Sequence, residues 1–176
     1  GGAGAGVGGG QVKEVEGNLM GHELRLCLVA SRFNETVVQR LVAGAERALR
    51  QHGVAETRCQ LVWVPGAMEI PAVLSELAQS GSWDGLVALG AVIRGETPHF
   101  DQVARAVTEG VAQLGWRHRL PIGFGVLTVD SVAQAEERSG GKLGNKGFSA
   151  ALAAIEMASL LRQLRTAPPG GAPGAV

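Results

Sequence analysis

Short apolar runs alternate with segments of helical periodicity along most of this chain, and that alternation restricts its fold more than any other feature. Four runs are predicted as strands: Leu24–Ala30, Cys59–Val64, Gly85–Ile93 and Pro121–Val129. These runs are apolar at nearly every position, which is typical of parallel strands buried on both faces. The pattern predicts an α/β protein, a three-layer αβα sandwich around a four-stranded parallel sheet.

The segments between the strands predict helices that cover both faces of this sheet. Apolar residues recur at helical spacing in Glu35–His52, Glu69–Gln79, His99–Trp116, Ser131–Arg138 and Lys146–Leu164. Ser131 and Gln134 form the Ser-x-x-Gln pattern of a capping box, and Gly53 follows the first helix as a stop signal. Right-handed crossovers between the strands then give a doubly wound, flavodoxin-like arrangement.

The length of 176 residues suits one domain, which we expect to span residues 11–165. Residues 1–10 are Gly, Ala and one Val, and residues 166–176 read TAPPGGAPGAV. Such segments bury too little side chain to offset the entropy of ordering, so both ends are predicted to be disordered tails.

Composition excludes several classes of partner. The 16 basic and 16 acidic residues cancel, so the chain has no net field to attract nucleic acid or an anionic membrane. Two cysteines and four scattered histidines give neither a disulfide framework nor a metal-ligand pattern. No export signal or membrane span is apparent, so we expect a cytoplasmic protein without metal or cofactor.

Ligands of parallel α/β sheets bind where the strands end, so the residues that follow each strand are the candidates for a site. Phe33 follows the first strand, where a ring either fills the core, the commoner case, or stacks on a flat ligand. Asn34 is predicted to cap the helix that starts at Glu35. The Pro65-Gly66 turn after the second strand exposes peptide groups, which could pair with the imide edge of a pyrimidine or only turn the chain.

The segments after the third and fourth strands carry more ionisable residues, which are stronger candidates for catalysis and binding. Arg94–Asp101 crowds ionisable residues at a corner punctuated by Gly and Pro, and His99 there is a candidate general acid and base, although a lone histidine is more often a surface residue. After the fourth strand, a glycine-rich link carries Arg138, Lys142 and Lys146. It reads equally as a phosphate cradle or as a solvated linker.

Together these segments carry a family resemblance. RFN after the first strand, VPGAMEIP after the second, GAVIRGETPHFD after the third, FGVLT on the fourth and ERSGGKLGNKG after it occur in that order. This series closely resembles the 6,7-dimethyl-8-ribityllumazine synthase family, and the resemblance runs from about Gly17 to Leu164. It implies a transferase of riboflavin biosynthesis that needs no cofactor.

The resemblance also implies the roles of individual residues. Phe33 would stack on 5-amino-6-(D-ribitylamino)uracil, with Phe124 reaching the same substrate from an adjacent subunit. The remaining contacts to this substrate would come from Ala67, Met68, Glu69, Ala91, Val92 and Ile93. The family often has an aromatic residue where this chain has Met68, and a tyrosine where it has Gln102.

The second substrate would be L-3,4-dihydroxy-2-butanone 4-phosphate. By resemblance, Glu96 and Thr97 would contact it, Arg138 would pair with its phosphate and Lys146 would assist. His99 would carry protons between the reacting groups, so His99 and Arg138 are the expected catalytic residues. A non-catalytic flavin- or lumazine-binding protein or a shell-forming protein on the same scaffold is the alternative, but neither would need both of these residues.

The resemblance further implies a homo-oligomer, either a cyclic pentamer or pentamers packed into an icosahedral shell. The short link Gly140–Gly144 favours the shell, because family members that stop at pentamers tend to carry insertions there. Residues 11–17 are expected to add a strand to a neighbouring subunit's sheet. Riboflavin synthase is a possible partner protein.

Overall fold

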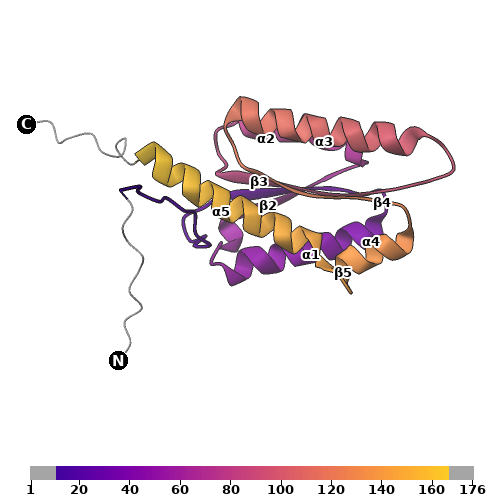
Figure 1. Cartoon of the computed structure of the whole chain (residues 1–176), viewed down its shortest axis with the longest axis horizontal. Helices are drawn as coiled ribbons and strands as arrows, with labels where there is room; N and C mark the ends of the chain where they lie inside the picture. The colour runs from indigo at the N-terminus through magenta and orange to yellow at the C-terminus, as the bar shows by residue number, and fades with distance from the viewer. Residues whose placement is uncertain (1–10, 167–176) are drawn as a thin grey trace, which may run out of the picture.

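The computed structural model describes residues 11–166 and confirms the predicted sandwich (Figure 1). Its parallel sheet has the order β2-β1-β3-β4. The strands are β1 (Leu26–Ser31), β2 (Cys59–Val64), β3 (Gly85–Ile93) and β4 (Ile122–Val129). β2 and β3 have the predicted bounds, and the other two differ by one or two residues. The terminal segments 1–10 and 167–176, which were predicted as tails, lie outside the described residues.

Helices cover both faces of the sheet, as Figure 1 shows. One layer holds α2 (Ile70–Gln79) and α3 (His99–His118), and the other holds α1 (Glu35–Gln51), α4 (Val132–Arg138) and α5 (Lys146–Thr166). Short 3-10 turns, η1 (Glu56–Arg58) and η2 (Ala67–Glu69), flank β2. The helix that was predicted to start at Glu69 therefore begins with a 3-10 turn.

Several helix ends differ from the predicted bounds by one or two residues, and side chains at the ends of α4 and α5 make local bonds. The Ser131 hydroxyl accepts from Gln134 N at 3.2 Å, which confirms the cap of α4, but the Gln134 side chain accepts from Asp130 N rather than from Ser131. Thr166 was predicted as the first residue of a tail and is instead the last residue of α5. Its hydroxyl donates to the Arg162 carbonyl oxygen at 2.8 Å.

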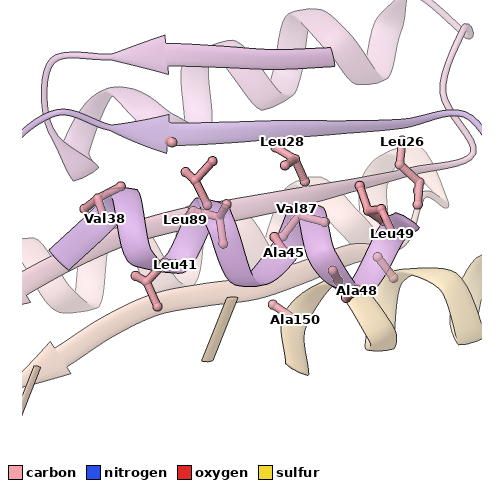
Figure 2. Packing of buried hydrophobic residues seen from close by; sticks show 14 of the residues in the cluster. Leu26, Leu28, Val38, Leu41, Ala45, Ala48, Leu49, Val87, Leu89 and Ala150 are labelled. Carbon is pink, nitrogen blue, oxygen red and sulfur yellow. The ribbon is translucent and has the colours of Figure 1, made fainter. Parts of the chain in front are cut away.

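The core has one part on each face of the sheet. Every residue of β1 is buried, so its side chains alternate between the two parts. Leu26 and Leu28 pack under α1 and α5, while Cys27 and Val29 pack under α2 and α3. Figure 2 shows α1 laying its apolar stripe over the first of these faces.

Small residues allow the start of α5 to lie directly on α1. A Cβ atom on Gly147 would overlap the carbonyl oxygen of Leu41, so only glycine fits at this crossing. Asn145 fastens the same contact, since its Nδ2 donates to Arg40 O at 2.9 Å and its Oδ1 accepts from Phe148 N at 3.1 Å. These contacts fix the position of Lys146, the first residue of α5.

Burial of Cys27 predicts an alkaline loss of stability. Burial, with a smaller effect from Cys59, raises the pKa of the Cys27 thiol from 9.0 to about 12. Between these values the unfolded thiol is ionised and the native thiol is not, so unfolding releases a proton and becomes easier as the pH rises. We expect Cys27 to lower the unfolding free energy by about 1.4 kcal/mol per pH unit above 9. Urea unfolding at pH 8 to 10.5 should show a flatter pH dependence for Cys27→Ala; equal slopes would contradict the prediction.

Candidate active site

The loops after the first three strands are tied together at the carboxyl edge of the sheet. Phe33 N donates to Pro65 O at 3.0 Å, which joins the loop after β1 to the loop after β2. Asn34 Nδ2 donates to Ala91 O at 3.0 Å, which joins the loop after β1 to the end of β3. These two bonds fix the loop that carries Phe33 relative to both neighbouring strands.

The structure excludes one of the two alternatives for Phe33 and corrects the prediction for Asn34 in part. Phe33 does not fill the core: 72% of the residue is exposed, so its ring is presented at the edge of the sheet. Asn34 occupies the N-cap position of α1, but it makes no side-chain capping bond there. Its backbone is left-handed, with φ of 63°, a conformation that Asn tolerates better than most residues, and its side chain is engaged by Ala91 instead.

The loop after β2 presents two side chains beside Phe33's loop. Met68 and Glu69 are exposed, whereas Ala67 is buried. Glu69 N donates to Gly66 O at 3.1 Å, which closes the turn. Of this predicted trio, Met68 and Glu69 can meet a ligand with their side chains.

The end of β3 presents mostly backbone. Ala91 and Val92 are buried, one in each part of the core, and Ile93 is half-buried. Ala91 and Val92 could bound a substrate ring only with their peptide groups, because their side chains are already packed. The loop before α3 carries Glu96 and Thr97, and His99 is the first residue of α3. All three residues are exposed.

A second group of predicted residues lines a pocket beside strand β4. This pocket has a volume of about 420 Å³ and brings together Phe124, Arg138 and Lys146, with Asn145 and Ser149. It lies between β4, which is an edge strand of the described sheet, and the N-terminus of α5. Two cationic side chains beside the N-terminus of a long helix form a setting that favours a phosphate group.

Arg138 is held from one side only. Its Nη1 donates to Gln134 O at 3.2 Å and lies 3.6 Å from Glu137 Oε2, both on α4. A guanidinium carries five N–H donors, so these contacts through Nη1 leave donors for a bidentate phosphate contact. The side chain is 37% exposed and lines the pocket.

Lys142 does not belong to this group, so the predicted cradle of three cations is wrong in part. Residues Ser139–Gly141 (β5) and Gly144–Asn145 (β6) pair as an antiparallel hairpin, which the sequence reasoning read as an irregular link. Lys142 sits at its tip and lines a different hollow, with Arg40 and Glu136. Gly144 follows this tip with a left-handed φ of 83°, and the presence of a glycine here is the sequence signal that could have indicated a turn.

The pocket beside β4 does not include the predicted residues of the sheet edge. The sheet edge carries Phe33, Met68, Glu69, Glu96, Thr97 and His99, and the pocket beside β4 carries Phe124, Arg138 and Lys146. Neither Phe33 nor His99 lines the described pocket that contains Arg138. One chain thus presents two separate groups of candidate residues.

The model of the family described as 6,7-dimethyl-8-ribityllumazine synthase matches residues 23–162. The chain belongs to the 6,7-dimethyl-8-ribityllumazine synthase family. This family belongs to riboflavin biosynthesis. The match confirms the resemblance that was inferred from the five sequence segments. The match includes both groups of candidate residues, from the strand before Phe33 to most of the helix that begins at Lys146.

The described part of this lumazine synthase family member contains no candidate metal-binding cluster and no helix that could span a membrane. Within residues 11–166, no three His, Cys, Asp or Glu side chains group closely enough to hold a metal ion. None of the helices in this part of the chain is both long enough and apolar enough to cross a membrane.

The sequence did not indicate that Arg94 is a structural element of the sheet edge, because its partner Asp130 lies 36 residues away in the sequence.

Proposed function

We propose that this chain is a transferase that condenses 5-amino-6-(D-ribitylamino)uracil with L-3,4-dihydroxy-2-butanone 4-phosphate. The products are 6,7-dimethyl-8-ribityllumazine, phosphate and water. The observation that carries the proposal is the pocket that gathers Arg138 and Lys146 beside Phe124, in a chain of this family. It offers a phosphate clamp next to an aromatic ring, as a phosphorylated sugar and a flat heterocycle require.

The complete site would form between two copies of the chain. Along the same edge of β4 lies an apolar groove of about 770 Å³ between α3 and α5, and Phe124 lines both the groove and the cationic pocket. Trp116 is 78% exposed on this groove, and Leu164 is 56% exposed. Apolar surface of this kind is usually covered by a partner. A second copy seated there would bring its own sheet edge toward Arg138.

The larger assembly is part of the same proposal. In a ring in which each copy covers the groove of the next, every sheet edge would meet the cationic pocket of a neighbour. The expected form is a pentamer, either free or packed into a shell. The hairpin of β5 and β6 keeps the link after α4 compact, which suits the shell. Glu16 accepts a hydrogen bond from Gln163 at 2.8 Å, so residues 11–17 leave the domain from beside α5, available to pair with a neighbour.

The chemistry needs positioning and proton transfer. The amine of the pyrimidine adds to the ketone and loses water to give an imine, phosphate then leaves, the enol tautomerises, and the second nitrogen closes the ring with loss of another water. Phe33 would stack on the pyrimidine, and Glu69 would hold its ribityl hydroxyls. Arg138 and Lys146 would stabilise the departing phosphate, and His99 would carry protons at the imine and enol steps.

A direct assay tests the proposal. The purified chain is mixed with both substrates, and lumazine absorbance and inorganic phosphate are followed together. We expect lumazine and phosphate to appear in equal amounts. A chain that binds lumazine but releases no phosphate would be a non-catalytic binding protein, and the proposed function would be wrong. A chain that consumes lumazine and forms riboflavin would also contradict it.

A further inference from the structure

The residue that follows β3 connects three segments of the sheet edge. Arg94 N donates to Val129 O at 2.9 Å, which extends the ladder between β3 and β4 by one bond. Its Nε donates to Asp130 Oδ1 at 2.8 Å, and its Nη2 lies 3.6 Å from Asp101 Oδ1. One guanidinium thus bridges the end of β4 and the first turn of α3.

The same guanidinium also covers an aromatic ring. Its Cζ lies 4.4 Å from the centroid of the Phe100 ring, within the range of a cation–π contact. Phe100 and Asp101 are the two residues that follow His99 in the first turn of α3. His99 lies in this turn. Arg94 therefore holds the turn by contacting two consecutive side chains, Phe100 and Asp101.

The start of α3 has no side-chain cap and follows an exposed loop. Pro98 occupies the N-cap position and makes no side-chain capping bond. The loop residue Gly95 has open space where its Cβ would be, and Glu96 and Thr97 are exposed. An uncapped first turn frays more readily, because its N–H groups lack partners. Phe100 packs against the core part under α2 and α3, and the contacts of Arg94 add a polar link from this turn to the end of β4.

We propose that Arg94 is a positioning residue that fixes the imidazole of His99 for proton transfer. This inference rests on the proposed function, in which His99 is the proton carrier. Arg94 differs from Arg138 in its surroundings: two carboxylates and a ring face its guanidinium, so its charge is matched within the chain and is not offered to a phosphate. The hydrogen bond to Asp130 raises the pKa of Arg94 above its ordinary value, so the guanidinium stays charged.

The test combines Arg94→Ala, Arg94→Lys and Asp130→Asn with His99→Ala in double-mutant cycles. Arg105→Ala is the matched control. Arg105 is an exposed arginine on α3, the helix that begins at His99, and it forms an ion pair of 3.8 Å with Glu109. We expect Arg94→Ala to lower kcat by roughly 10- to 100-fold with KM for each substrate changed less than about threefold, since a small misplacement of a reacting group is costly. Arg94→Lys should recover part of this loss, and Arg105→Ala should have no effect.

The cycle shows whether Arg94 acts through His99. We expect Arg94→Ala to cost nothing further in a His99→Ala background. Additive losses would overturn the inference, as would a raised KM for the phosphate substrate with kcat unchanged, because Arg94 would then bind that substrate itself. Amide hydrogen exchange provides a second readout: the first turn of α3 should exchange faster in Arg94→Ala than in Arg105→Ala. If the wild-type chain makes no lumazine, the proposed function fails, and unchanged exchange would separately overturn the role of Arg94.

Discussion

Replacing Arg138 with alanine is expected to lower kcat/KM for the butanone phosphate by about 10²- to 10³-fold, through both a higher KM and a lower kcat. The reason is that the guanidinium would bind the phosphate remote from the reacting ketone and then stabilise it as it leaves. Steady-state rates of lumazine formation at varied concentrations of each substrate measure the effect.

Lys142→Ala is the matched control for this loss. Lys142 follows Arg138 by four residues and is also cationic, but it lines the hollow beside Arg40 rather than the pocket with Phe124. We expect its removal to leave kcat/KM within about twofold of wild type, as for most exposed residues away from a site. Arg138→Lys should recover only part of the activity, because an ammonium cannot bind phosphate in the bidentate mode. Equal effects of the two alanine variants would show that the pocket is not the phosphate site.

The second large effect is expected from His99→Ala. Loss of a positioned acid and base should lower kcat by about 10²- to 10⁴-fold, with little change in KM, because His99 would act on protons rather than on binding. Added imidazole should restore part of the rate if the space left by the side chain admits it. Single-turnover measurements with excess enzyme separate this chemical defect from product release.

His118 supplies the control for that experiment. It lies in the last turn of α3, at the opposite end of the helix that begins at His99, so His118→Ala tests the loss of an imidazole from the same element without touching the site. Full activity in His99→Ala would require another proton carrier. A large loss in both variants, with lowered Tm, would indicate an effect on the fold of α3.

The fold could be predicted from the sequence because its signals are local. Continuous apolar runs set the strands, and β2 and β3 have the predicted bounds. The capping serine of α4 was equally readable, since Ser131 bonds within its own turn. The exposure of Phe33 could not be read in this way, because a ring at a strand end is compatible with the core or with solvent until neighbouring strands are placed.

The candidate site could be predicted in its residues but not in its grouping. The sequence presented Arg138, Lys142 and Lys146 as one cationic segment, whereas a hairpin turns Lys142 away. Asn34 appeared to be a helix cap, but its partner Ala91 lies 57 residues away. Arg94 and Asp130 meet only because β3 and β4 are adjacent in the sheet. Such long-range pairings depend on topology, which residue spacing does not encode.

Two copies of the chain are proposed to share each site, and mixing two inactive variants shows whether they do. His99→Ala and Arg138→Ala chains are co-refolded in equal amounts, so that subunits assort at random within each ring, and lumazine formation is measured. If the site joins the His99 edge of one copy to the Arg138 pocket of the next, about a quarter of the sites regain both residues, and about a quarter of wild-type activity should return. Activity no higher than that of either variant alone would show that each site lies within a single chain, and would contradict the account.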